Sequence, residues 1–318
     1  MSGEQSFVAK AKNSLVEAIK GVGDVTNATL ETVSSSLVTA LKGTKDIGSE
    51  AGDLIKNTII GTVQGIVEVG GEVGSAAKGL ILGVVTGTKD VATNTLDAVG
   101  ESTTTLIKTT SDLGGNVAQT AKGAIQGAVV GAKDMGETVV DAVTKTSTAI
   151  VKGVTAVGGE LGSTVKETLI GTAHAAKEIG EQTVETIGHT AGSLVKATIE
   201  FGGDLASSVK GSMLGAMQGT QEIGGKVLET VSHTASSMVK AVGQVGGDVG
   251  STAKHAVEGA IEGAKSIGVN TSEAASEAAT SALQAAGEIS SAAGEHVRNA
   301  VTGTISGVKV VLKKPFQK

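Results

Sequence analysis

The sequence predicts an all-α protein built from an eleven-residue helical repeat. The main observation is the distribution of charge when residues are sorted by the remainder of their number on division by 11. Of the 58 charged residues (26 basic and 32 acidic), only Glu4 falls in columns 0, 3, 4, 7 and 8, where chance would place about 26. Spacings of 3, 4, 7, 8 and 11 describe one face of an α-helix, whereas a strand would alternate with a period of two.

The second observation is a longer repeat of 44 residues, or four elevens. A Gly-Gly pair recurs at this step, at 70–71, 114–115, 158–159, 202–203 and 246–247. A phrase of the form Gly-Thr-Lys-Asp-Ile-Gly keeps the same step from residue 43 to residue 268. Fixed periods of this length are the signature of repeat architectures, so we assign residues 26–269 to the repeat.

The flanking segments differ from the repeat. Residues 1–25 follow the same helical pattern and are expected to lead into it. Residues 270–307 are rich in Ala, Ser and Glu, favour helix and are interpreted as a cap, while residues 308–318 form a basic tail with the only proline. We expect this charged tail to be frayed.

The uninterrupted register favours one long continuous helix. The apolar spacing of four residues continues across the Gly-Gly pairs, as from Val69 to Val73. Eleven residues in three turns give about 3.67 residues per turn, which predicts a right-handed coiled coil, a multi-helix bundle or a filament. Hairpins whose turns preserve the phase are the alternative.

Glycine content makes an isolated helix of this sequence unstable. Each Gly in a helix interior costs about 1 kcal/mol relative to Ala, and the chain has 47 of them. We therefore expect the monomer to be largely unfolded until its apolar face is covered, so that folding is coupled to binding.

Small residues on the apolar face favour packing of this face against other helices. Column 4 lies near the centre of this face and holds ten Gly, and small residues let helix backbones approach closely. The sequence predicts a non-enzymatic structural protein that self-assembles as a homo-oligomer. The predicted helix-packing residues are Gly70, Val73, Gly114, Val117, Gly158, Leu161, Gly202, Leu205, Gly246 and Val249.

A lipid surface is the alternative cover. Lysines recur in column 1 at one flank of the apolar face, where long side chains can reach lipid phosphates. The adjacent acidic column and the absence of Trp and Tyr weaken this alternative. The candidate lipid-flanking residues are Lys78, Lys89, Lys122, Lys133, Lys166 and Lys177.

The Lys-Asp/Glu-apolar-Gly phrases at eleven-residue spacing resemble those of eleven-residue-repeat amphipathic-helix proteins, including synucleins, perilipins and late-embryogenesis-abundant proteins. The similarity spans most of the chain. It implies a non-enzymatic protein that gains helix on a surface, in an assembly or on drying, so protection against desiccation or cold is a third function. No individual binding residue is carried over.

Composition and motifs exclude several function classes. The chain lacks Cys, Trp and Tyr and has a net charge of −6, so disulfides, thiolate chemistry and a polybasic nucleic-acid surface are not expected. No catalytic triad or phosphate loop stands out, and we expect no enzyme activity, cofactor, metal or small-molecule substrate. The five histidines lie in polar columns, with His189 and His233 about 66 Å apart in a continuous helix.

The sequence also gives no targeting signal. The start lacks an apolar segment after a basic end, and the longest uncharged stretches, such as 57–67 and 211–221, are near 11 residues. We expect an intracellular protein, either cytoplasmic or peripheral to a membrane.

Overall fold

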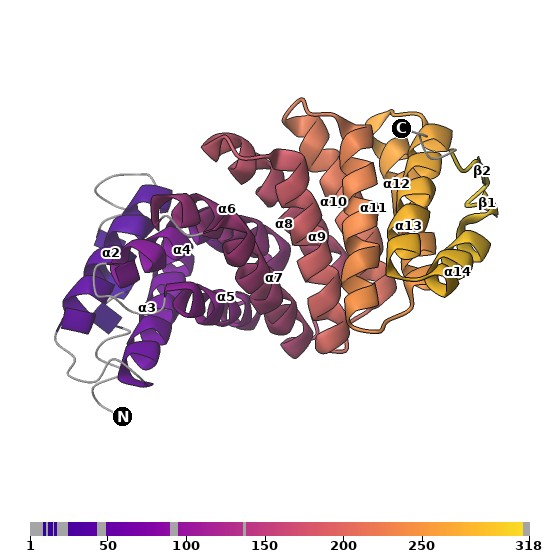
Figure 1. Cartoon of the computed structure of the whole chain (residues 1–318). Coiled ribbons are helices and arrows are strands. Elements are labelled where there is room, and N and C mark those ends of the chain that lie inside the picture. Colours follow the sequence, from indigo (N-terminus) through magenta and orange to yellow (C-terminus); the bar gives the residue numbers. More distant parts are fainter. Residues whose placement is uncertain are drawn as a thin grey trace. The chain divides into compact units, whose positions relative to one another are not determined.

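The computed structural model describes residues 9–10, 12–14, 16–17, 25–42, 49–89, 95–135 and 138–313. Within these ranges the predicted all-α class is confirmed, since helices account for almost all of the regular structure (Figure 1). The helices are α2 (Val25–Lys42), α3 (Ser49–Glu68), α4 (Val73–Lys89), α5 (Thr95–Asp112), α6 (Val117–Met135), α7 (Val139–Ala156), α8 (Leu161–Ile179), α9 (Thr183–Glu200), α10 (Leu205–Glu222), α11 (Val227–Gln244), α12 (Val249–Ile267), α13 (Thr271–Ile289) and α14 (Ser291–Val301). Two short strands follow, β1 (Gly303–Ile305) and β2 (Val308–Val310).

The expectation of one continuous helix is wrong. From α4 to α13, each helix begins 22 residues after the one before it, at residues 73, 95, 117, 139, 161, 183, 205, 227, 249 and 271. Because 22 is two elevens, each helix and its turn return the next helix to the same phase. The structure therefore follows the alternative of hairpins that preserve the register, and the 44-residue repeat is a pair of antiparallel helices.

Glycine ends these helices by adopting a left-handed backbone conformation. Gly202 has φ +68°, its N–H donates to the carbonyl of Ile199, and the N–H of Gly203 donates to the carbonyl of Thr198. This is the Schellman pattern, in which the first residue beyond the helix needs a positive φ that glycine adopts without strain. The Gly-Gly pairs are therefore stop signals at the ends of helices.

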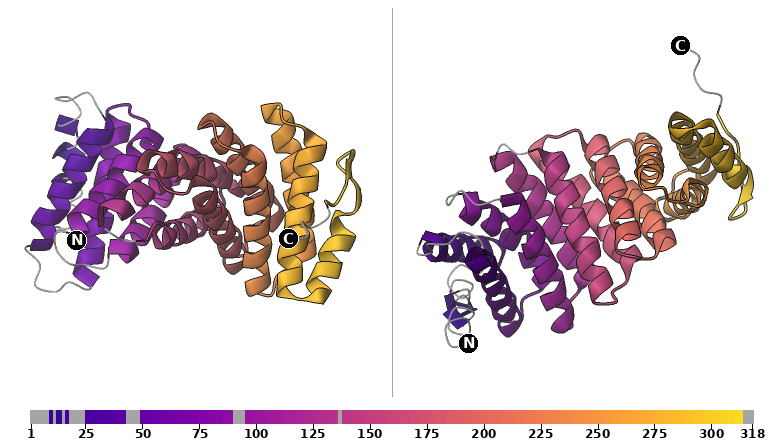
Figure 2. Two further views of the ribbon diagram at one scale, coloured as in Figure 1. Left: turned by 45° about the horizontal axis from the view of Figure 1, so that its top comes forward. Right: turned by 60° about the horizontal axis from the view of Figure 1, so that its bottom comes forward.

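Helices of each compact unit form two layers. The first unit ends at Gly159 and the second begins at Glu160. In the first, α2, α4 and α6 pack side by side in one layer and α3, α5 and α7 in the other. In the second, α8, α10 and α12 form one layer and α9, α11 and α13 the other (Figure 2). Consecutive helices contact across the layers, which is the arrangement of an α-solenoid.

The core follows the eleven-residue columns through both layers. Every described residue from Val33 to Val297 whose number is a multiple of 11 is at most 4% exposed. These side chains are Val, Ile, Ala and Thr, and the threonines among them hydrogen-bond through their hydroxyls, as Thr110 does by donating to the carbonyl of Leu106 at 2.8 Å. The apolar face that the sequence left without a cover is covered by the chain's own helices.

The C-terminal end of the second unit is closed by a different structure. The short helix α14 packs on α12 and α13, and strand β2 of an antiparallel hairpin packs on α13. The backbone N–H groups of Val311 and Lys313 donate to the hydroxyls of Ser276 and Thr280 at 3.3 and 3.0 Å. The expected frayed tail is therefore wrong for residues 308–313, while residues 314–318 lie outside the described residues.

Asp204 caps α10, and this cap predicts a pH-dependent stability. The Ser207 hydroxyl donates to the Asp204 carboxylate at 2.6 Å, and the Ser207 N–H donates to it at 3.2 Å. These bonds hold the pKa of Asp204 below its ordinary value of 3.8. Asp204→Ala should lower the free energy of unfolding by about 1 kcal/mol at neutral pH. The Asp204 carboxylate stabilises the fold only while it is ionised. The difference between the two proteins should therefore shrink as the pH falls through the pKa of Asp204 in the folded state.

Urea unfolding at neutral pH and below pH 3.8 measures this difference. Asp204→Asn is the matched control, because its amide oxygen caps the helix without titrating. An alanine variant as stable as the parent protein at neutral pH would contradict the role of the cap.

Candidate functional site

The glycines predicted to pack helices lie in turns instead. Gly70, Gly114, Gly158, Gly202 and Gly246 all have φ between +63° and +74°, and no atom lies within 4 Å of the position that a Cβ would take. Their assignment to a helix-packing face is therefore wrong. They belong to the alternating half of column 4 that ends helices, as Gly180, Gly224 and Gly268 also do, whereas members of the other half, such as Leu169, lie within helices and are fully buried.

The five apolar residues predicted alongside these glycines lie at the starts of helices. Each is the first residue of a helix in the α4, α6, α8, α10 and α12 series. Val73, Leu161 and Val249 are buried, and Val117 and Leu205 are half-buried. They close the ends of the core next to each turn.

A second set of glycines makes the closest helix contacts. In α6 they are Gly123, Gly127 and Gly131, and in α10 they are Gly211, Gly215 and Gly219, in each case spaced by four residues. A Cβ at Gly127 would lie 2.6 Å from the carbonyl oxygen of Lys78 in α4, and one at Gly215 would overlap that of Lys166 in α8. These small-residue rows let the helices of one layer approach each other backbone to backbone.

Sequence reasoning missed this set although it carries a readable signal. A row of three glycines at positions i, i+4 and i+8 occurs in α4 at Gly79, Gly83 and Gly87, recurs in α6 and α10, and two of its members return in α12 at Gly259 and Gly263. The rows lie in columns 2, 6 and 10, outside the five uncharged columns, so the charge pattern alone does not reveal them.

Several of the candidate lipid-flanking lysines contact neighbouring helices. The Nζ atoms of Lys89 and Lys177 donate to the backbone carbonyls of Asp134 and Ile223 at 2.7 Å, each at the end of the next helix in the same layer. Lys78, Lys122 and Lys166 are half-buried, and Lys133 is exposed. A cation at the C-terminus of a helix satisfies free carbonyls and complements the helix dipole.

In the second unit, an ion pair joins α10 and α12, which lie in the same layer. Lys210 of α10 donates to Glu258 of α12 at 2.7 Å, and this hydrogen bond raises the pKa of Lys210 above its ordinary value. These contacts span 45 to 48 residues and hold successive repeats in register.

Histidine placement also differs from the expectation for a continuous helix. His189 and His233 lie on the neighbouring helices α9 and α11, so the separation of about 66 Å is wrong. His174 of α8 contacts Glu222 of α10 at 3.0 Å. Among the described residues, no group of three or more His, Asp or Glu side chains is placed to hold a metal ion.

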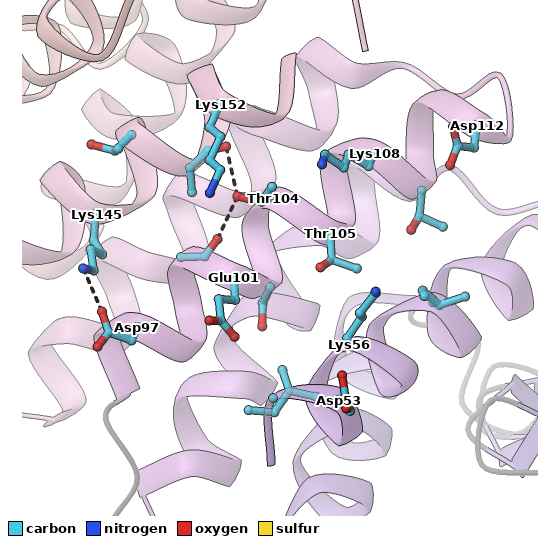
Figure 3. Close-up of a pocket in the computed structure, with 18 residues that line it drawn as sticks. Asp53, Lys56, Asp97, Glu101, Thr104, Thr105, Lys108, Asp112, Lys145 and Lys152 are labelled. Carbon is cyan, nitrogen blue, oxygen red and sulfur yellow. Dashed lines mark hydrogen bonds and ion pairs between the residues drawn. The ribbon is translucent and has the colours of Figure 1, made fainter. Parts of the chain in front are cut away.

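A groove lined by charged side chains in the first unit is the main candidate binding site. It has a volume of about 870 Å³ and is formed by α3, α5 and α7 of one layer (Figure 3). Its charged lining is four lysines and four carboxylates, and hydroxyls of Ser and Thr fill much of the rest. The charged residues are Lys56, Lys108, Lys145, Lys152, Asp53, Asp97, Glu101 and Asp112.

The groove exists because its helices pack loosely at their glycines. A Cβ at Gly52 would meet only Glu101, at 3.5 Å, and one at Gly100 only Lys145, at 3.6 Å. At Gly188 of α9, which is equivalent to Gly100 in the repeat, a Cβ would lie 2.9 Å from the Ser237 hydroxyl of α11. The corresponding space in the second unit is therefore narrower at this position.

Three of the four groove lysines have no partner among the described residues. Lys145 pairs with Asp97 at 2.7 Å, whereas Lys56, Lys108 and Lys152 form no ion pair or hydrogen bond there. Figure 3 shows their side chains pointing into the groove from α3, α5 and α7 respectively. At the groove wall, Ser102 is 1% exposed and its hydroxyl has no hydrogen-bond partner.

Comparisons give no assignment for this arrangement. No described helix has the length and hydropathy needed to span a membrane. No family model and no curated protein matches the sequence.

Proposed function

We propose that this chain is a non-enzymatic structural protein that acts as a repeat scaffold. The observation that carries this proposal is the burial of the eleven-residue columns by the chain itself, from Val33 to Val297. Stacked helix pairs bury a continuous core in which each repeat contacts its neighbours, and such arrays present extended surfaces to partners. The 44-residue repeat then serves to build a surface of fixed spacing.

The distribution of exposed apolar side chains favours a scaffold rather than an amphipathic helix that folds on a lipid surface. Large exposed hydrophobic residues among the described positions are scattered at helix ends and in the terminal segment; they are Val67, Leu113, Val140, Ile289 and Val311. A helix that binds a lipid surface needs a contiguous apolar stripe on its outer face. Here that stripe is turned inward, so neither lipid nor a second chain is needed to cover it.

Circular dichroism combined with size-exclusion chromatography and light scattering tests this proposal. The scaffold predicts a helical monomer whose helix content stays constant on dilution and on addition of neutral or anionic vesicles. Helix that grows with protein concentration and particle mass would instead support self-assembly into a bundle or filament. Helix that forms only with vesicles would support the lipid-binding alternative, and either outcome would overturn the proposal.

A further inference from the structure

We propose that the groove between α3, α5 and α7 binds a phosphorylated polyol or sugar, with the phosphate held by Lys56, Lys108 and Lys152 and the hydroxyls by Asp53 and Glu101. This inference is independent of the scaffold's assembly state, because all of these residues lie within the first unit. It rests on the charged side chains that line this one groove and have no partner among the described residues.

Cations from three helices reach the same groove. Lys56 comes from α3, Lys108 from α5 and Lys152 from α7, and none has a partner within the described part of the chain. A phosphate carries several acceptor oxygens and up to two negative charges, so it can accept hydrogen bonds from several ammonium groups at once. Like charges that converge without partners are stabilised when an anion lies between them.

The carboxylates of the groove select the rest of the ligand. Asp53 and Glu101 have no partner among the described residues and can only accept hydrogen bonds when ionised. Ligand hydroxyls would donate to them, whereas a second anionic group would be repelled. Four lysines and four carboxylates line the groove, so a polyanion such as a nucleic acid gains little there.

Hydroxyl groups complete the polar lining. The Ser102 hydroxyl is buried without a partner, and Thr104, Thr105, Thr109 and Thr148 also line the groove. Threonine hydroxyls at the groove can accept hydrogen bonds from ligand hydroxyls. No aromatic side chain is part of the lining, so a nucleobase or other flat ring has no surface on which to stack.

Glucose 6-phosphate, inorganic phosphate and glucose are suitable probes for isothermal titration calorimetry with the full chain. We expect glucose 6-phosphate to bind with a Kd on the order of 100 μM, and phosphate or glucose at least about tenfold more weakly. Vesicles that contain a phosphorylated inositol lipid form a further arm. If these vesicles compete with glucose 6-phosphate, the ligand is a lipid headgroup. If they do not compete, the ligand is a free phosphorylated polyol or sugar.

Lysine variants locate the site. Lys108→Ala with Lys152→Ala should weaken binding of glucose 6-phosphate by at least about tenfold, because two charge-assisted hydrogen bonds are lost. Lys196→Ala is the matched control, since Lys196 of α9 lies 44 residues after Lys152, at the equivalent repeat position outside the groove. Unchanged circular dichroism would show that each variant is folded.

Glu101→Gln tests the polyol half of the proposal. Loss of this carboxylate should weaken the binding of glucose 6-phosphate, because an acceptor for ligand hydroxyls is weakened. It should strengthen the binding of inorganic phosphate, because the anion is repelled less. Three results would overturn the proposal: no binding of glucose 6-phosphate at millimolar concentration, equal affinity for inorganic phosphate, or an equal loss in the Lys196→Ala control.

Discussion

Gly215→Ala is expected to destabilise the protein by about 1–2 kcal/mol, even though alanine is the better helix former. Gly215 lies in the middle of α10, and its added Cβ would overlap the carbonyl oxygen of Lys166 and lie 2.9 Å from the Cβ of Leu169. Alanine gains about 1 kcal/mol in helix propensity, but forcing two backbones apart in a packed core costs about 1–3 kcal/mol or more. The clash with a backbone atom cannot be relieved by a rotamer change, so the net effect should be unfavourable.

Urea unfolding measures this difference, with Gly287→Ala as the control. Gly287 also lies within a helix, α13, but has no atom within 4 Å of the position of a Cβ. That substitution should stabilise the protein by about 0.5–1 kcal/mol. If the two Gly→Ala substitutions change the free energy of unfolding in opposite directions, close packing is separated from helix propensity. If both stabilise the protein, α8 and α10 are not in close contact.

Gly158 provides a different test of the turn glycines. Gly158→Leu would block helix packing if the chain formed one continuous helix, but the residue has φ +63° and open space around its Cβ position. A leucine there is strained by its backbone conformation alone, at about 1–2 kcal/mol. The effect should therefore appear as lower stability of the monomer.

The all-α class could be predicted because charge exclusion from five columns is a property of the whole chain. Helix boundaries were harder, since column 4 mixes two kinds of position. Residues 37, 59, 81, 103, 125 and onward every 22 residues are buried within helices, whereas the described glycines between them end helices. A period of 11 superimposes these two sets, and only the 22-residue alternation between other residues and glycine separates them.

The groove could not be predicted in the same way. Lys56, Lys108 and Lys152 are separated by 52 and 44 residues and lie in polar columns, where lysine is expected on a solvated face. Their convergence depends on the stacking of α3, α5 and α7, and the open space depends on how tightly glycines such as Gly100 are packed. Both are tertiary properties with no periodic signal.

The final helix and hairpin predict the second large effect. A chain that ends at Ser290 lacks α14 and the β-hairpin, which together cover α12 and α13. Val297 and Val301 are fully buried, and they lie at the end of a solenoid whose α13 is lined with buried alanines such as Ala278 and Ala282. Loss of this cover should lower the free energy of unfolding by about 3 kcal/mol or more, because each buried valine contributes about 1.5–3 kcal/mol.

The truncated chain should also associate. Terminal repeats with a polar outer face keep solenoids soluble, and removing one exposes an apolar face that matches another copy of itself. Urea unfolding and light scattering over a range of protein concentrations measure both effects. Lys313→Ala is the control, because it removes only the exposed ion pair with Glu277 and should cost under about 1 kcal/mol. A truncated chain that stays monomeric with an unchanged urea midpoint would show that α14 and the hairpin are not a cap.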